Sequence, residues 1–206
     1  LLPVIPIIGF LQLLKNILLN QVDLFLLLYK DIREFQRYYW IPSFKIQYIP
    51  FKINAYEKVI KADIRQEEYV LSAGMSMRDY DTFIKAMREL HYPAIILLHE
   101  SVKNDSKYNW LRTKNLSNVD IVYVNSESDL WINVLKKAKI FVLCILPEAI
   151  DASGTGTYIM AMALKKCVII TDSPATRNIL ENDINAIIIP SRDPLVLKET
   201  IKKTWE

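Results

Sequence analysis

Two short segments combine glycine with hydroxyl or basic side chains directly before an expected helix. The first, SAGMSMRDY, carries Gly74 and Arg78, and the second, SGTGT, runs from Ser153 to Thr157. Backbone N–H groups at the start of a helix are unpaired and lie at the positive end of its dipole, so they bind anions. Glycine lets a phosphate approach the backbone without a Cβ in the way. Hydroxyl groups in the second segment and the guanidinium of Arg78 would add donors and a positive charge.

Two of the four glycines, Gly154 and Gly156, stand in the second segment, and they have two interpretations. They leave room for a ligand phosphate, or they serve only a tight turn and close packing between helix and strand. Neither segment matches GxGxxG followed by an acidic residue about 20 positions on, and there is no Walker lysine motif. Dinucleotide and ATP binding are therefore not favoured.

A metal site is not expected. The chain has two histidines and no CxxC or HExxH spacing, which are the usual sources of transition-metal ligands. Cys144 and Cys167 both stand in apolar runs, so we expect two buried thiols in a reducing, cytoplasmic setting. The net charge of +3 is too small to favour nucleic acid as a partner, and it fits one local anion site.

Short apolar segments rich in Ile and Val alternate with segments of helical periodicity over the last two thirds of the chain. Strands of this kind are typical of a parallel sheet that is buried on both faces, with helices as crossovers. The strands are expected at 69–73, 94–98, 120–124, 140–145, 167–171 and 186–190. The helices between and after them are expected at 79–90, 126–138, from 153 onward, at 173–182 and at 193–204. The predicted fold class is α/β, a Rossmann-like doubly wound parallel sheet.

Three of these helices begin with a recognisable cap. Ser126 is a candidate N-cap. Ser173-Pro174 and Asp193-Pro194 each pair a capping residue with a proline in the first turn, where a missing N–H costs nothing. In such a sheet, ligands bind outside the carboxyl ends of the strands, where both glycine segments are expected.

The first part of the chain is less regular. Strands are expected at 22–28 and 45–51, with a helix at 31–40 between them and a polar connector at 54–68. The apolar start at 1–19 is broken by Pro3 and Pro6 and is too short to span a membrane. It is either a core helix that lost its partners or an interfacial segment, and we interpret the chain as a piece of something larger.

The order of these segments resembles a known family. Residues 69–90 resemble the first strand, glycine loop and helix of the donor-binding domain in retaining glycosyltransferases of the GT-B fold, family 4. Residues 153–201 resemble the family's signature segment, and residues 22–54 look like the end of its first domain and the crossing into the second. The resemblance implies that residues 1–54 are the tail of the N-terminal acceptor domain and the crossing segment. Residues 55–206 would be the C-terminal nucleotide-sugar-binding domain.

The resemblance also implies the roles of individual residues. Gly74 and the backbone after it would face the diphosphate, Arg78 would pair with the phosphates, and Val124 and Asn125 would lie where the nucleobase is held. The loop and helix start near the diphosphate and donor sugar would comprise Ser153, Gly154, Thr155, Gly156 and Thr157. Glu148, just before this loop, would contact donor sugar hydroxyls as a catalytic residue, or else be a solvated loop charge.

Several positions depart from the family pattern. Many members carry two glutamates around the signature helix, where this chain has Ala152 and Met160, and a basic residue after the first-loop glycine, where this chain has Met75. Methionine cannot make the hydrogen bonds to the nucleotide ribose that the second glutamate makes. The donor site has therefore lost polar contacts or uses others.

The function that the resemblance implies is transfer of a hexose from a nucleoside-diphosphate sugar to a carbohydrate or lipid-linked acceptor, with retention and without a metal or other cofactor. We expect this chain alone to bind nucleotide weakly and without turnover, and the alternative is a non-catalytic binding or scaffold module. Polysaccharide biosynthesis, a cytoplasmic location at the inner face of the membrane, and peripheral membrane association would follow by analogy.

Overall fold

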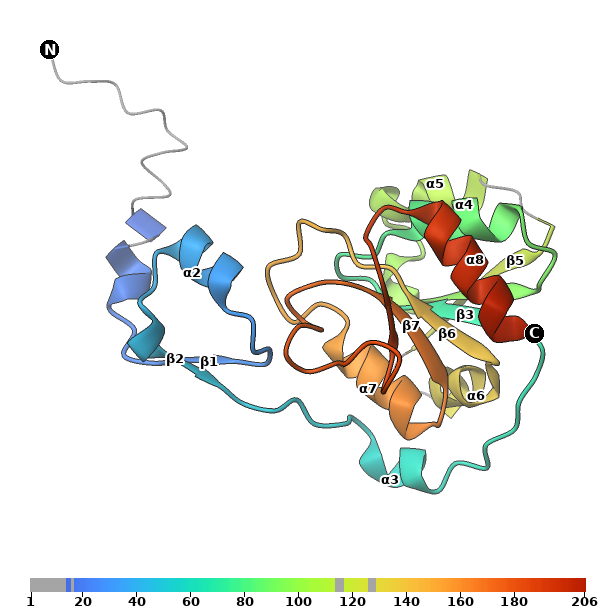
Figure 1. Ribbon diagram of the computed structural model, residues 1–206, viewed down its shortest axis with the longest axis horizontal. Helices are drawn as coiled ribbons and strands as arrows, with labels where there is room; N and C mark the ends of the chain where they lie inside the picture. Colours follow the sequence, from blue (N-terminus) through green and yellow to red (C-terminus); the bar gives the residue numbers. More distant parts are fainter. Residues whose placement is uncertain (1–13, 16, 114–116, 126–128) are drawn as a thin grey trace, which may run out of the picture.

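The structure is a computed structural model, and it describes residues 14–15, 17–113, 117–125 and 129–206. Its larger part is a parallel six-stranded sheet in the order β5-β4-β3-β6-β7-β8 (Figure 1). The strands are β3 (Val70–Ala73), β4 (Ala94–His99), β5 (Val119–Val124), β6 (Ile140–Leu143), β7 (Cys167–Thr171) and β8 (Ile187–Ile189). The predicted Rossmann-like doubly wound fold is confirmed.

Helices cover both faces of this sheet. One face carries α4 (Tyr80–Arg88), α5 (Asn109–Thr113) and α8 (Pro194–Trp205), with the short 3-10 turns η2 (Glu100–Val102) and η3 (Ser106–Tyr108). The other face carries α6 (Asp129–Lys137), α7 (Thr155–Ala163) and α3 (Tyr56–Ile60). The layers are visible in Figure 1, where α4 and α8 lie above the sheet and α6 and α7 below it.

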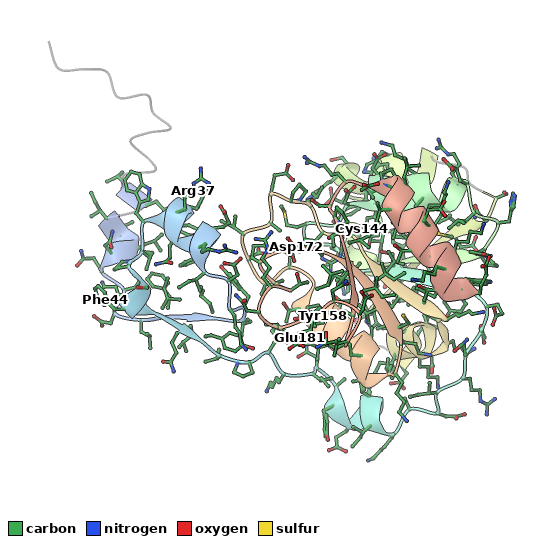
Figure 2. The ribbon with its side chains drawn as sticks, in the orientation of Figure 1. Arg37, Phe44, Cys144, Tyr158, Asp172 and Glu181 are labelled. Carbon is green, nitrogen blue, oxygen red and sulfur yellow. The ribbon has the colours of Figure 1, made fainter. Side chains whose placement is uncertain are left out.

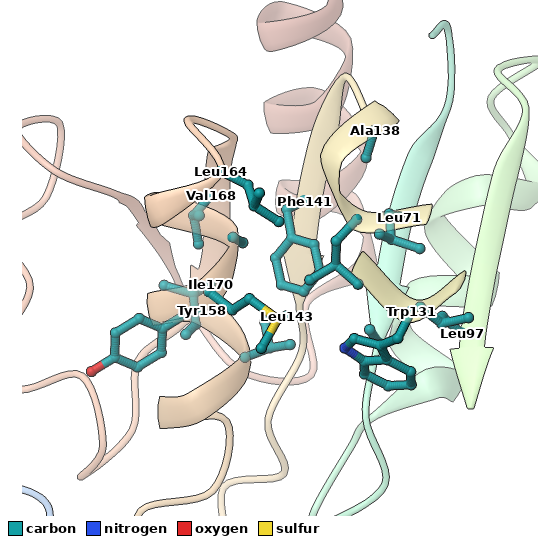
Figure 3. Close-up of a cluster of buried hydrophobic side chains, with 14 of the residues drawn as sticks. Leu71, Leu97, Trp131, Ala138, Phe141, Leu143, Tyr158, Leu164, Val168 and Ile170 are labelled. Carbon is teal, nitrogen blue, oxygen red and sulfur yellow. The ribbon is translucent and has the colours of Figure 1, made fainter. Parts of the chain in front are cut away.

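The central strands are buried on both faces, as their apolar runs predict. Successive side chains of a strand point to opposite faces, so Leu71 and Phe141 join the cluster under α6 and α7, whereas Val70 and Val142 join the cluster under α4 and α8. Figure 3 shows Phe141 in the first cluster, between the side chains of both helices. Full burial of a side chain of this size contributes roughly 1.5–3 kcal/mol.

The order in which the chain adds strands to the sheet changes direction between the parallel neighbours β3 and β6. These strands are neighbours, with Val70 opposite Ile140 and Leu71 opposite Phe141. From β3 the chain proceeds outward to β4, and from β6 it proceeds the other way to β7. The loops that leave β3 and β6 therefore lie side by side at the carboxyl edge, where this class of fold binds ligands.

A smaller unit precedes the sheet. It contains the parallel pair β1 (Phe25–Leu27) and β2 (Ile46–Tyr48), with α2 (Arg33–Tyr39) and η1 (Ser43–Lys45) between them. Side chains such as Phe44 project from it into solvent (Figure 2). An extended connector leads from β2 past α7 to β3 and includes α3, which lies within the polar segment expected at 54–68.

Two expectations about local structure are wrong. Residues 174–179 form a succession of turns instead of the expected helix. The Ser173 hydroxyl does not act as an N-cap there; the N–H of Ser173 instead donates to Thr176 Oγ1 at 3.0 Å. The helix start predicted at Asp193-Pro194 is confirmed, because Asp193 Oδ1 accepts from the N–H of Val196 at 3.0 Å and caps α8.

The two cysteines differ in burial. Cys144 is buried as expected, but Cys167 is exposed, because it is the first residue of β7, at the edge of the part of the sheet that the helices cover.

Three expectations concern residues outside those described. Ser126 is one of them, as are Pro3 and Pro6 and most of the apolar start. Within the described ranges, no helix combines the length and hydrophobicity needed to cross a membrane.

Candidate functional site

The two glycine loops are joined by backbone and side-chain contacts. Arg78 and Ile145 form an antiparallel bridge, and the N–H of Leu146 donates to the carbonyl of Met77 at 2.8 Å. The hydroxyl oxygens of Ser76 and Ser153 lie 3.2 Å apart. The loop after β3 and the loop after β6 therefore form one surface, as the strand order requires.

The guanidinium of Arg78 lies at the centre of this surface. Its Nε donates to the carbonyl of Ala73 at 3.0 Å, Nη1 donates to the carbonyl of Ser76 at 2.5 Å, and Nη2 donates to Thr157 Oγ1 at 3.3 Å. Arg78 belongs to none of the ion pairs found among the described residues. Removal from water lowers its pKa, although the group stays positive because arginine titrates far above neutral pH. A partly buried cation without a counter-ion is suited to bind an anion.

The glycines make room for side chains of the protein itself. Gly74 has φ +107°, and a Cβ there would lie only 3.0 Å from Cζ and Nε of Arg78. Gly154 has φ +92°, and its Cβ would lie 2.7 Å from Leu143 Cδ2. A Cβ on Gly156 would lie 3.2 Å from the ring of Phe51, which belongs to the connector. Close packing accounts for Gly154 and Gly156, and their phosphate role stays a prediction.

The start of α7 offers free backbone donors. The N–H groups of Gly154 and Gly156 have no hydrogen-bond partner among the described residues, and Gly154, as N-cap, supplies no side-chain cap. Both groups lie at the positive end of a nine-residue helix. Unpaired donors at the positive end of a helix are suited to an anion, and the binding itself stays a prediction.

The three hydroxyl groups of this segment differ in their surroundings. Ser153 Oγ donates to the carboxylate of Asp151 at 2.5 Å, which also accepts from the Ser153 N–H. Thr155 is buried, and its Oγ1 has no partner within the described part of the chain. Thr157 alone combines contact with Arg78 and a place in the wall of a cavity.

That cavity has a volume of about 450 Å³ and lies between the connector, α6 and α7. It is lined by Asn54, Ala55, Trp131, Ile132, Gly156, Thr157 and Met160. Its size is within the range of small-molecule sites, roughly 300–1,000 Å³. Sequence reasoning missed Trp131 and Asn54, because helical spacing identifies Trp131 only as a core residue and nothing local marks Asn54.

The remaining expected residues lie around this centre. Val124 ends β5 and is buried in the same cluster as Trp131, and Asn125 follows it on the surface. Glu148 is exposed and forms an ion pair with Arg192, in the loop that precedes α8. The ion pair gives Glu148 a structural partner and leaves its catalytic role a prediction.

The smaller N-terminal unit is attached beside this site. Asp31 is 3% exposed and accepts from Arg33 at 2.7 Å and from Arg177 Nη1 at 3.2 Å. The hydrogen bond from Arg33 is the main reason that the pKa of Asp31 falls to about 2, with Arg177 adding to it. Arg177 also donates to the carboxylate of Asp172, and the Tyr29 hydroxyl donates to the carbonyl of Ile150 at 2.7 Å. Two contacts thus fix the unit to the loops after β6 and β7.

Comparison with known proteins identifies the family. The model of the family "Glycosyl transferases group 1" matches residues 68–206, which include the whole sheet and both glycine loops. The chain belongs to the glycosyl transferases group 1 family. A search of curated proteins finds no match.

Solved structures share the GT-B glycosyltransferase fold with this family member. A glycosyltransferase from Rickettsia africae superposes with a TM-score of 0.69 at 19% identity over 98% of this chain. TarM superposes with a TM-score of 0.66 at 17% identity over 96% of it. Anabaena Alr3699/HepE, in complex with UDP and glucose, superposes with a TM-score of 0.65 at 13% identity over 100% of it. At such identities the likeness establishes the fold alone.

The chain spans only part of these structures. It covers 57% of the Rickettsia africae protein, 39% of TarM and 61% of HepE.

Proposed function

We propose that this chain is the donor-binding portion of a retaining, hexose-transferring glycosyltransferase of family 4. In this reaction the bond between the anomeric carbon and the diphosphate oxygen breaks. A bond from the same carbon to an acceptor oxygen forms, and the acceptor loses a proton. Residues 1–54 are the tail of the acceptor domain and the crossing segment, and residues 55–206 hold the nucleotide-sugar. Family membership and the HepE complexes with UDP and UDP-glucose support this proposal.

The observation that carries the proposal is the environment of Arg78. Its guanidinium is half-buried between the two glycine loops, without an ion-pair partner among the described residues, and contacts the first turn of α7 through Thr157. The leaving diphosphate carries the charge that develops in the transition state, and fixed positive groups stabilise it most where water is excluded. Arg78 and the N–H groups of Gly154 and Gly156 supply that positive field, so the proposal includes no metal or other cofactor.

The other expected residues have supporting roles in this proposal. The backbone after Gly74 approaches the diphosphate, Val124 and Asn125 border the nucleobase, and Ser153 and Thr155 shape the turn before α7. Glu148 contacts sugar hydroxyls only if it leaves Arg192. We therefore regard it as the weakest member of the proposed set.

Calorimetric titration of the chain with UDP and GDP tests the proposal. We expect binding of at least one of them, and Arg78→Ala should weaken it by ten-fold or more, since a charge-assisted contact contributes roughly 1.5–3 kcal/mol. Arg65→Ala is the matched control, because Arg65 is an exposed arginine of the connector paired with Asp63. Absence of heat at millimolar ligand, or equal effects of both substitutions, would overturn the proposal.

A second candidate is a non-catalytic binding module. It is favoured by Ala152 and Met160, because none of the described residues that line the cavity beside α7 has an ionisable side chain. The two candidates differ in turnover and not in binding. Release of UDP or GDP from a nucleotide-sugar by the protein that includes the acceptor domain supports the enzyme, and tight binding without release supports the module.

The acceptor and the location are part of the same proposal. We propose a carbohydrate or lipid-linked acceptor, a role in polysaccharide biosynthesis, and a cytoplasmic protein at the inner face of the membrane, by analogy with the family. Flotation with anionic and with neutral lipid vesicles tests the membrane part. Recovery of the chain in neither vesicle fraction would remove that part and leave donor binding in place.

A further inference from the structure

The indole N–H of Trp131 has no hydrogen-bond partner among the described residues. Trp131 belongs to α6, is 7% exposed and lines the 450 Å³ cavity. Among the residues that the structure describes, none accepts a hydrogen bond from its Nε1, although buried indole N–H groups usually have an acceptor. Figure 3 shows the nitrogen edge of the ring turned toward the side of the cluster where Tyr158 of α7 lies. A donor in this position is available to a molecule in the cavity.

The walls of the cavity select the kind of group that fits. Met160 and Ile132 are apolar, Asn54 contributes a neutral amide, and none of the described lining residues has an ionisable side chain. A phosphate placed there would lose its hydration without a cation to replace it. A flat neutral ring suits the site better, because a thioether packs favourably against aromatic faces.

The cavity adjoins the anion site at Thr157. Thr157 forms part of its wall, and the same residue accepts a hydrogen bond from Arg78 at 3.3 Å. Gly156 likewise lines the cavity, and its N–H at the start of α7 has no partner in the part of the chain that the structure describes. A ligand that spans both places has an anionic end at Arg78 and a neutral, ring-containing end beside Trp131, which describes a nucleoside diphosphate.

We propose that Trp131 is a donor-specificity residue whose Nε1–H donates to an oxygen of the nucleoside. The inference rests on the proposed function and adds to it the residue that recognises the nucleoside part. It also accounts for binding in a cavity where Met160 offers no hydrogen-bonding group. Trp131 then distinguishes a nucleoside diphosphate from pyrophosphate, whereas Arg78 contacts what both ligands share.

Titration with two probes tests this division. A panel of UDP, GDP, ADP, CDP and dTDP identifies the tightest nucleotide, which is then compared with inorganic pyrophosphate. Trp131→Phe keeps most of the ring and removes the N–H, so it should weaken the nucleotide about three- to ten-fold, the range for one hydrogen bond, and leave pyrophosphate unchanged. Trp205→Phe is the matched control, because Trp205 stacks on Tyr92 beneath Lys139, away from the cavity. Arg78→Ala should weaken both probes.

The possible outcomes separate the two proposals. If Trp131→Phe weakens the binding of nucleotide and of pyrophosphate equally, or of neither, the inference is overturned. Nucleotide binding that depends on Arg78 would still support the proposed function in that case. If the chain binds no nucleotide more tightly than pyrophosphate, the inference also fails. Absence of binding to every probe overturns the proposed function itself, and the inference with it.

A second measurement does not depend on a Trp131 variant. The four tryptophans each give one indole N–H signal in a proton–nitrogen correlation spectrum. Single substitutions of Trp40, Trp110 and Trp205 by Phe assign the Trp131 signal by elimination. Addition of the nucleotide should shift this signal and addition of pyrophosphate should not. An unmoved signal at saturating nucleotide contradicts the proposed hydrogen bond.

Discussion

Arg78 Nη2 lies 3.3 Å from Thr157 Oγ1, and this contact joins residues that are 79 positions apart in the sequence. It links the loop after β3 to the first turn of α7. These loops leave the two neighbouring strands, β3 and β6, from which the strand order runs outward in opposite directions. Because the same guanidinium holds the carbonyls of Ala73 and Ser76, the anion site and the junction of the two loops depend on one side chain.

Gly74→Ala should destabilise the protein by at least about 1 kcal/mol, because alanine is strained at positive φ. The new Cβ would also displace the Arg78 guanidinium, so pyrophosphate affinity should fall in the same variant. Urea unfolding and calorimetry measure the two effects.

Gly156→Ala is the control for this substitution. Gly156 lies in α7 with ordinary φ, and a helical alanine gains roughly 1 kcal/mol over glycine, which the 3.2 Å contact with Phe51 offsets. We expect an unfolding midpoint close to that of the original chain. Equal destabilisation by both substitutions would show that the backbone conformation at Gly74 is not what matters.

Asp31→Asn should remove stability above pH 5 and have little effect near pH 2. The pKa of Asp31 is lowered from 3.8 to about 2 by its arginine partners, chiefly Arg33. A lowered pKa in the folded state stabilises the protein above the unfolded-state pKa, and this stability is lost as the pH falls toward 2. The shift corresponds to about 2 kcal/mol at pH 7. Urea unfolding at pH 7, 5 and 3 measures it.

Asp172→Asn provides the comparison for Asp31. Asp172 also pairs with Arg177, but its side chain is 45% exposed, and exposed ion pairs contribute roughly 0–1 kcal/mol. Its substitution should therefore cost less at pH 7 than that of Asp31. A larger effect at Asp172 would mean that Asp31 does not fix the N-terminal unit to the sheet.

Asp193→Ala should cost about 1 kcal/mol, the usual loss when an N-cap side chain is removed. The carboxylate of Asp193 accepts from the N–H of Val196, and Asp193→Asn keeps an acceptor at the same position. Thermal unfolding followed by circular dichroism should rank the original chain and the Asn variant together, above the Ala variant. If Asn is as destabilising as Ala, charge and not capping explains the effect.

A thiol reagent should modify one cysteine of the folded chain. Cys144 is buried, which raises the pKa of its thiol, and Cys167 is exposed. We expect one equivalent of modification under native conditions and two in denaturant, with the native signal lost in Cys167→Ser. Rapid modification of both thiols in the folded chain would contradict the burial of Cys144, which directly follows β6.

Two similar sequence patterns show where prediction from local signals ends. Asp193-Pro194 begins α8, whereas Ser173-Pro174 begins a series of turns. In the second case Ala175 and Thr176 are buried, and the carbonyl of Ala175 accepts from the Tyr158 hydroxyl of α7 at 3.1 Å. These tertiary contacts hold the backbone in a form that the capping pattern does not specify.

The candidate site likewise contains residues that local patterns predict and one that only the tertiary structure reveals. Gly74, Arg78 and the segment from Ser153 to Thr157 could be predicted, because short patterns of glycine, hydroxyl and base mark helix starts at the carboxyl edge of a sheet. Trp131 could not, since its spacing on α6 is that of a core residue. Its free N–H becomes visible only when α6, α7 and the connector enclose a cavity.

Hydrophobic periodicity and the positions of glycine and proline were enough to determine most strands and helices, because local conformation depends on neighbours in the sequence. The parallel sheet followed from strands that are apolar on both faces. The tertiary structure alone decided that Arg78 lies over Gly74, that Asp31 binds Arg177 across 146 positions, and that Trp131 borders a cavity. Such contacts depend on strand register and on side-chain rotamers of distant segments, and no local pattern encodes either of them.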